Sequence, residues 1–482
     1  MVMESYVKSL SSEKKTLLIA CCTGALIMPL MSTMMNLALV DIGEWFTVGS
    51  KDLAMVNTIF LLGSVVAMVP FARLSDLVGR KKIFIFGLVV TIVSAVIAAL
   101  SPHFYILLIM RFISGVGAAA VSTTSVAMLT EVFPFERRGW AIGIQTACIY
   151  VGSAMGPAFG GFICGFLGWR EIFFLTIPFA VVSLFFLLRF KRELVTCAGC
   201  MDYRGAILFS STIMVTMCGA IGLPDIWNGS IELQNLWSPL LIAIGLVMLY
   251  YFLRSTKKAE FPVLDTSVFK YKVFSRSCLA AYMNYASSYS VSFFMALYLQ
   301  SIGALSPMQA GLVIMIQPAI QVVLTAKFGS HSDRIKDKRV LPTLGMAITG
   351  VGVAMIIFLG TTVNFWFVGL LLVILGVGYG VFAAPNTSAV MSSLPPKNRG
   401  AASGMIALVR QLGMMTSMTI AMCSISIIMG TADDLGPSTV DSFGPFVTVL
   451  QVAFTVCFIM CVVGTIVSWF RGNNPEGISE YE

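Results

Sequence analysis

The sequence predicts an all-α polytopic membrane protein, in which two six-helix bundles flank two extra helices to give fourteen transmembrane helices. Three observations predict this fold. Hydrophobic residues make up 57% of the 482 residues and charged residues only 11%, whereas about 25% of residues are charged in soluble domains. Fourteen apolar runs are long enough to span a bilayer. The basic residues gather in short clusters between these runs.

Each apolar run is expected to form one membrane helix of about 20 residues. The run at 238–253 is the shortest for such a span. The approximate limits of the fourteen runs are 17–40, 53–72, 83–101, 104–131, 138–163, 171–190, 203–224, 238–253, 276–300, 308–329, 341–360, 363–392, 400–429 and 445–470.

The distribution of lysine and arginine predicts the orientation. With the N-terminus inside the cell, 27 of the 31 basic residues fall in cytoplasmic loops or tails, and only Lys51 and Arg170 fall outside. Arg111 and Arg410 lie within helices. This asymmetry follows the positive-inside rule, so we expect a multi-pass protein of the cell membrane with both termini cytoplasmic. It also explains the net charge of +8 without a nucleic-acid partner.

A short internal repeat divides the chain. Residues 72–82, ARLSDLVGRKK, are echoed by residues 326–339, AKFGSHSDRIKDKR, and each stretch joins the second and third helices of a six-helix unit. Repeats around a central site are the architecture of transporters that work by rocking. We therefore expect an N-terminal six-helix bundle at 1–190, two inserted helices and linkers at 191–270, and a C-terminal six-helix bundle with a short cytoplasmic tail at 271–482.

The run over 143–161 contains residues that disfavour a soluble helix, at about 1 kcal/mol per glycine and about 3 kcal/mol for proline. They are Gly143, Gly152, Gly156, Pro157, Gly160 and Gly161. Gly152, Gly156 and Gly160 recur every fourth residue, so they share one face on which another helix can approach closely. The alternative interpretation of these glycines is that they serve ordinary packing between two helices. The full spacing, however, resembles the antiporter signature of the fifth helix in exporters of the major facilitator superfamily.

Further stretches extend this resemblance to nearly the whole chain, which is similar to the fourteen-helix drug:proton antiporter family of that superfamily. These stretches are 72–82, 108–119, 261–275 and 409–413. The resemblance implies the major facilitator fold and a secondary active transporter, which exports small organic compounds by alternating access in the manner of multidrug efflux. Protons are the expected coupling ion, and we expect a monomer without cofactor or metal.

The loop motif and its echo supply the expected conformational residues, together with the glycine run. They are Asp76, Gly79, Arg80, Asp333 and Arg334. Asp76 and the basic residues after it could form charge-assisted bonds with helix ends of the opposite half in one state only. The bland alternative is a solvated turn whose lysines set the topology. Leu77 and Ala72 depart from the family pattern, which has a basic residue and a glycine there.

The first helix departs further from the family. Met31 occupies the position where the family carries an aspartate, the expected proton-binding or cation-binding group. The predicted helices therefore have no acid near the membrane midplane. The coupling candidates are therefore Asp41, at the outer end of the first helix, Glu131, at the inner end of the fourth, and Arg111. Asp41 is preferred because Arg111 enters the membrane from the same side, where the two could pair.

Polar side chains within the helices are candidates for a substrate cavity, although each could equally serve as a contact between helices. As a set they suit a broad organic ligand, and two intramembrane arginines favour neutral, zwitterionic or anionic compounds over dications. The candidates are Thr33, Asn36, Asn57, Gln145, Tyr150, Tyr285, Tyr289, Gln317, Gln321, Asn386, Arg410 and Gln411.

Two other functions remain open beside efflux. One is a metabolite or organic-anion exporter or facilitator that lacks proton coupling through the first helix. The other, more distant, is a membrane-embedded enzyme. An enzyme would need clustered nucleophiles, acids or metal ligands, whereas His103 and His331 lie in loops and the CxxC pair Cys197 and Cys200 has no second pair nearby to complete a zinc site.

Overall fold

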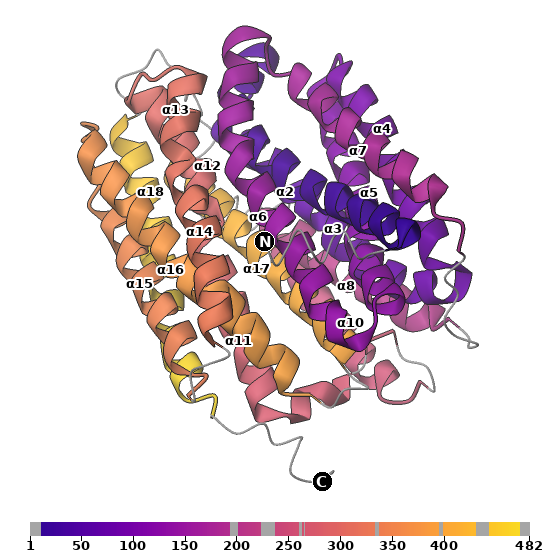
Figure 1. The fold of residues 1–482 in the computed structure, drawn as a ribbon. Coiled ribbons are helices and arrows are strands. Elements are labelled where there is room, and N and C mark those ends of the chain that lie inside the picture. Colours follow the sequence, from indigo (N-terminus) through magenta and orange to yellow (C-terminus); the bar gives the residue numbers. More distant parts are fainter. Residues whose placement is uncertain are drawn as a thin grey trace.

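The computed structural model describes eight stretches of the chain, which are 11–192, 201–222, 237–259, 263–264, 266–332, 337–394, 399–429 and 443–472. Within these stretches every regular element is a helix, numbered as in Figure 1. Thirteen helical segments there are long and apolar enough to cross a membrane. The prediction of an all-α polytopic membrane protein is therefore confirmed.

Six helices form the N-terminal half of the molecule. They are α2 (Ser12–Phe46), α3 (Ser50–Val78), α4 (Arg80–Ala99), α5 (Phe104–Val132), α6 (Phe135–Phe166) and α7 (Glu171–Arg189). Gly79 alone separates α3 from α4. Its φ of 118° lies in a region that glycine adopts without a steric penalty. The chain can therefore reverse direction at this residue without a longer loop.

Two helices follow before the second half begins. α8 (Tyr203–Gly222) and α10 (Trp237–Thr256) pack against each other, and α8 also contacts α3 of the first half and α17 (Arg399–Met429) of the second. The inserted pair thus touches both halves. The division of the chain at residues 190 and 270 stays a prediction.

The C-terminal half is built from more pieces than the sequence predicts. After a 3-10 turn, η2 (Thr266–Lys270), come α11 (Lys272–Ser288), α12 (Ser290–Leu297), the π-helical turn η3 (Tyr298–Ile302), α13 (Pro307–Ile314), α14 (Ile316–Ser332), α15 (Val340–Ile357), α16 (Phe365–Ser392), α17 and α18 (Phe443–Trp469). The path from α11 to η3 replaces the single helix expected over 276–300. α13 and α14 together form the span expected over 308–329.

The break between α11 and α12 has a local cause. The hydroxyls of Ser287 and Ser288 both donate to the carbonyl oxygen of Asn284. Serine hydroxyls that bond backward along a helix compete with the backbone ladder and bend the helix. A continuous apolar run in the sequence therefore becomes two α-helical segments and a π-helical turn, and π turns occur often at functional sites.

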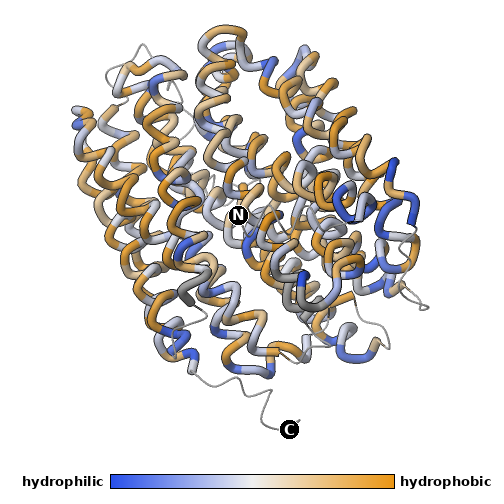
Figure 2. The backbone as a smooth tube through the Cα atoms, in the orientation of Figure 1, coloured by the Kyte–Doolittle hydropathy of each residue, from blue (hydrophilic) through white to orange (hydrophobic). Residues whose placement is uncertain are grey.

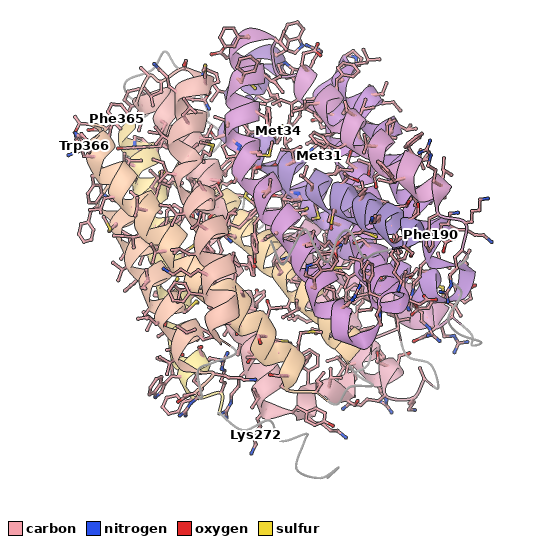
Figure 3. The ribbon with its side chains drawn as sticks, in the orientation of Figure 1. Met31, Met34, Phe190, Lys272, Phe365 and Trp366 are labelled. Carbon is pink, nitrogen blue, oxygen red and sulfur yellow. The ribbon has the colours of Figure 1, made fainter. Side chains whose placement is uncertain are left out.

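The two halves lie side by side, with the early helices in indigo to magenta and the late ones in salmon to yellow (Figure 1). Hydrophobic residues run along the helices and hydrophilic ones gather mostly at helix ends (Figure 2). Phe365 and Trp366 project from the outer edge of α16 (Figure 3), and Trp366 is 90% exposed. Large apolar side chains on the outside are what a lipid-facing surface requires.

Helix direction defines two sides of the molecule. Ser12 begins α2 on one side, and the Thr343 hydroxyl near the start of α15 bonds Ser468 at the end of α18 on that same side. We call it the terminal side. The opposite side, called distal, carries the end of α6 and the start of α13, which contact each other.

Candidate functional site: a central cavity between the halves

A cavity of about 190 Å³ lies where the two halves meet. The N-terminal half contributes side chains from α2, α3, α4, α5 and α6 to its wall. The C-terminal half contributes side chains from α11, α12, α14, α16 and α17. Because ten helices surround it, a molecule in this cavity would contact both halves at once.

Ten of the twelve polar residues predicted from the sequence line this single cavity. They are Thr33, Asn36, Gln145, Tyr150, Tyr285, Tyr289, Gln317, Gln321, Arg410 and Gln411. The sequence analysis missed several hydroxyl-bearing residues on the same wall, namely Ser32, Ser125, Ser153, Ser288, Ser292 and Tyr379. Their positions on the helix faces of the predicted residues could have revealed them, since Ser292 follows Ser288 by one turn and Ser32 adjoins Thr33.

Asn57 and Asn386 lie outside the wall. Asn57 Nδ2 donates to Asn36 Oδ1 at 2.7 Å, so Asn57 lies behind a cavity residue. Asn386 Nδ2 donates to the carbonyl oxygen of Ser277 at 3.2 Å, and its Oδ1 accepts from Arg471 Nη1 at 3.0 Å. Both side chains therefore join helices, which was the alternative role for each polar residue.

Three glutamines that line the cavity have buried side-chain oxygens without a hydrogen-bond donor among the described residues. Gln145 Nε2 donates to Ser125 Oγ at 2.6 Å, and Gln411 Nε2 donates to Met28 Sδ at 3.1 Å. The Oε1 atoms of Gln145, Gln317 and Gln411 are buried and accept no hydrogen bond from the described residues. An unsatisfied buried acceptor is costly, so these oxygens favour a ligand that carries hydrogen-bond donors.

Tyrosines connect the cavity wall across the halves. The Tyr289 hydroxyl donates to Ser32 Oγ at 2.9 Å, and Tyr150 and Tyr285 line the same cavity from opposite halves. In each pair one residue belongs to the N-terminal half and the other to the C-terminal half. The halves are therefore joined at the cavity by a polar contact that a ligand or a rocking motion can replace.

The cavity carries positive charge and no carboxylate among the described residues that line it, where Arg410 is the one charged side chain. Met31, at the position where an aspartate was expected, is 2% exposed and belongs to an apolar cluster with Ile27 and Phe84. Figure 3 shows Met31 and Met34 on α2. Neither methionine lines the cavity.

Arg111 is fully buried in α5 and has neutral partners. Its Nε donates to the carbonyl oxygen of Val56 at 3.3 Å, its Nη2 donates to Asn57 Oδ1 at 3.3 Å, and its guanidinium lies 4.4 Å from the centre of the Phe60 ring. The expected pairing with Asp41 is absent, and Asp41 makes no ion pair with any described residue. The prediction that Asp41 and Arg111 pair relied on their similar depth in the membrane, and depth does not determine the direction of a side chain around its helix.

The loop motif forms a compact charge cluster inside the N-terminal half. Arg80 contacts Asp76 Oδ1 at 2.9 Å, Glu131 Oε2 at 3.1 Å and the carbonyl oxygen of Ala127 at 2.9 Å. Lys81 Nζ donates to the carbonyl oxygen of Phe190 at 2.5 Å; Phe190 is labelled in Figure 3. These contacts of Arg80 thus stay within one half, and Glu131 lies here rather than beside the cavity.

The echo of this motif is only partly visible, because Asp333 and Arg334 lie outside the described residues. Nearby, Asp337 pairs with Arg339 at 2.9 Å, and this bond holds the pKa of the Asp337 carboxyl below its usual range. Arg471 is buried against Asn386 and the carbonyl oxygen of Lys338. Burial lowers the pKa of Arg471 to about 10, so it stays charged at neutral pH. Arg471 thereby joins the terminal end of α18 to α16.

The glycines of α6 face α2. A Cβ atom added at Gly152 would lie 2.8 Å from the carbonyl oxygen of Leu26, and one at Gly160 would lie 2.8 Å from Met34 Cα. A Cβ at Gly156, between them, would collide with the hydroxyl of Thr33. The shared glycine face predicted from the sequence therefore packs on α2 of the same half.

Gly161 and Pro157 face the other half. A Cβ at Gly161 would collide with the carbonyl oxygen of Pro307, and a Cβ at Gly311 of α13 would collide with that of Pro157. The backbones of α6 and α13 thus touch directly on the distal side. A Cβ at Gly143 would meet nothing within 4 Å, so Gly143 takes no part in either contact.

Comparison with known proteins gives the same architecture. The profile of the Major Facilitator Superfamily matches residues 21–196 and 206–418. The chain is 28% identical over 406 residues to the "Riboflavin transporter RibZ" of Clostridioides difficile (strain 630), covering 83% of this chain and 86% of that protein. It is 25% identical over 409 residues to the "Multidrug resistance protein 3" of Bacillus subtilis (strain 168), covering 84% of this chain and 77% of that protein.

A solved structure shows the same fold. A bacterial homolog of the human lysosomal transporter Spinster superposes with a TM-score of 0.67 at 15% identity, covering 96% of this chain and 98% of that one. At this identity the likeness concerns the fold alone. The superfamily match spans both halves that enclose the cavity. This chain therefore belongs to the Major Facilitator Superfamily and is a multi-pass membrane transporter.

Proposed function

We propose that the chain exports small organic compounds across the cell membrane by alternating access, in the manner of a multidrug efflux transporter. The observation that carries the proposal is the central cavity, whose wall comes from both halves and whose distal end lies under the α6–α13 contact. A rocking motion that separates Gly161 from Pro307 would open the cavity distally. The relatives named for multidrug resistance support efflux.

We further propose that the terminal side faces the cytoplasm, because 27 of 31 basic residues fall on that side of the predicted topology. In a cysteine-free background, a membrane-impermeant maleimide added outside intact cells should label Lys51→Cys and leave Lys191→Cys unlabelled. Permeabilised cells provide the control, since both positions should then react. Labelling of Lys191→Cys in intact cells would reverse the proposed orientation.

The cluster of Asp76, Arg80 and Glu131 is proposed to bias the two conformations. Asp76→Asn removes the negative charge that faces the Arg80 guanidinium. The contact that joins the terminal ends of α3 and α5 through Arg80 should then be weaker, and the balance between the two states should change. We expect normal insertion and an altered reactivity of cavity cysteines. Lys82→Gln is the control, since Lys82 is exposed and lies next to the same turn. Unchanged reactivity and transport would leave Asp76 with a topological role only.

The charge of the cavity suggests its substrates. Arg410 has no acidic neighbour among the described lining residues, and in a medium of low dielectric an uncompensated charge acts strongly on a ligand. The three glutamine oxygens add acceptors for substrate donors. We propose that neutral, zwitterionic or anionic organic compounds are transported in preference to dications.

The test compares substrates and variants in proteoliposomes, with riboflavin as a neutral probe beside an aromatic carboxylate and a lipophilic dication. Arg410→Ala should reduce carboxylate transport by about tenfold or more, because it removes the charge that compensates the anion. Riboflavin transport should change less. Arg410→Lys is the matched control and should retain part of the carboxylate transport. Equal losses for both substrates, or strong dication transport by the native protein, would contradict this substrate class.

Proton coupling is proposed through Asp41, which is a peripheral acid of α2 and carries no ion pair among the described residues. Substrate-driven proton movement measured in the same vesicles should disappear in Asp41→Asn. The second candidate function is an organic-anion exporter or facilitator without proton coupling, and the absence of an acid from the described cavity wall favours it. Substrate transport with no proton movement in the native protein would select this second function.

A further inference from the structure

A chain of hydrogen bonds connects the buried arginine of α5 to the wall of the central cavity. Arg111 Nη2 donates to Asn57 Oδ1 at 3.3 Å, and Asn57 Nδ2 donates to Asn36 Oδ1 at 2.7 Å. Arg111 is fully buried and Asn57 is 1% exposed, whereas Asn36 lines the cavity. The chain of bonds therefore begins inside the N-terminal half and ends where a substrate would bind.

Arg111 sets the direction of each bond in this chain. A guanidinium has only donors, so the atom of Asn57 that faces Arg111 must be the side-chain oxygen. The amide nitrogen of Asn57 then faces Asn36 and requires the oxygen of Asn36 as its acceptor. The group of Asn36 left for the cavity is its amide nitrogen, Nδ2, which has no acceptor among the described residues and stays accessible.

The charge of Arg111 strengthens the donor at the end of the chain. Among the described residues Arg111 has no acidic partner, and its Nη1 is buried without an acceptor. Hydrogen bonds to a charged group are roughly twice as strong as neutral ones, and bonds in a chain polarise one another. Asn36 Nδ2 should therefore be a stronger donor than an isolated amide, on a wall where the unsatisfied glutamine oxygens are acceptors.

We propose that Asn36 binds a hydrogen-bond acceptor of the substrate, such as a carbonyl or carboxylate oxygen, and that Asn57 and Arg111 are positioning residues that fix its amide. The proposal rests on the export function proposed above and assigns one group of the substrate to one wall of the cavity. Arg410, on the wall that belongs to the C-terminal half, is available to an acidic group. A substrate with an acid at one end and a carbonyl at the other would satisfy both walls.

Replacing Asn57 by aspartate should reverse the amide of Asn36. The carboxylate can still accept from Arg111, but it has no donor for Asn36 Oδ1. Asn36 should then turn its nitrogen toward residue 57 and its oxygen toward the cavity. The donor offered to the substrate thus becomes an acceptor, while the size of the side chain at residue 57 hardly changes.

The experiment compares two probes that differ in this respect alone. The acetyl group of para-acetylbenzenesulfonate offers an acceptor, and the amino group of para-aminobenzenesulfonate offers N–H donors at the same ring position. Both probes are monoanions at neutral pH, so a change in the charge of the protein affects both equally. Their dissociation constants are measured by equilibrium dialysis on the full-length protein in lipid nanodiscs, with empty nanodiscs as the blank. Asn57→Asp should shift the ratio of the two constants by about tenfold in favour of the amino probe, as expected for one hydrogen bond.

Further variants show whether Asn57 acts through Asn36. Asn36→Ala removes the donor from the cavity wall and should also shift the ratio in favour of the amino probe. Adding Asn57→Asp to Asn36→Ala should change the ratio no further, because the side chain that it reorients is gone. Asn386→Asp is the matched control, since Asn386 also accepts from an arginine, Arg471, but lies outside the cavity wall. This control should keep the native ratio.

The outcomes separate this proposal from the export function on which it rests. Unchanged ratios in Asn57→Asp and Asn36→Ala, with both probes bound, would overturn the assignment of Asn36 alone. A further shift when Asn57→Asp is added to Asn36→Ala would overturn the positioning role of Asn57. Binding of neither probe by the native protein would contradict the anionic substrates of the proposed function itself. If Asn57→Asp does not fold, Asn36→Ala still decides whether Asn36 binds the acceptor.

Discussion

Replacing Gly156 by leucine should abolish transport and lower the amount of folded protein. A Cβ at this position already collides with the Thr33 hydroxyl and lies 2.8 Å from Thr33 Cβ and 3.3 Å from the carbonyl oxygen of Leu30. Overpacking of this kind costs about 1–3 kcal/mol or more. Since Thr33 lines the cavity, the displacement of α2 would also distort the binding wall.

The matched control is Gly143→Leu, on the same helix. A Cβ at Gly143 would meet nothing within 4 Å, so this variant should keep near-native transport and yield. Folded protein would be quantified by size-exclusion chromatography, and transport would be expressed per folded molecule. Near-native transport by Gly156→Leu would show that α2 and α6 can separate without loss of function.

Replacing Gly311 by alanine should act on conformation rather than folding. The added Cβ would collide with the carbonyl oxygen of Pro157, and this contact joins different halves on the distal side. The proposed distal-closed state would then become less stable, and transport should fall by about tenfold, corresponding to about 1.4 kcal/mol of bias between the states. The yield of folded protein should stay close to native.

The conformational shift can be measured directly. A single cysteine at the cavity residue Ser292, in a cysteine-free background, should react faster with an impermeant maleimide from the distal side when Gly311→Ala is present. Gly369→Ala on α16 is the control, because a Cβ at Gly369 would meet nothing within 4 Å. Unchanged reactivity together with native transport would mean that the α6–α13 contact does not open during the cycle.

The helices and the position of the cavity could be predicted from the sequence because both depend on local patterns. Apolar runs set the spans, and polar residues inside such runs rarely face lipid. Ten predicted residues accordingly meet at one cavity. Asn57 and Asn386 also avoid lipid, but they do so between helices. A single sequence does not distinguish these two buried environments.

Other features depended on neighbours distant in the chain. The partners of Arg111 come from α3, and Asp41, its expected partner, is not among them. Arg471 follows the last helix and could be taken for a tail residue, yet it is 1% exposed and bound to α16. The break at Ser288 arises from hydroxyl bonds within an otherwise apolar run, and hydrophobic periodicity does not detect it.

The pairing of α2 with helices made much later has a consequence for biosynthesis. Ser183 Oγ of α7 donates to the carbonyl oxygen of Ala20, 163 positions earlier, and the close contacts of α2 at Leu26 to Met34 require α6. While the ribosome is still translating the intervening residues, α2 has none of these partners. α2 therefore remains in the bilayer, or beside an insertase, without these partners until α6 and α7 have been synthesised. The N-terminal half can consequently complete its packing only as a unit, late in its own synthesis.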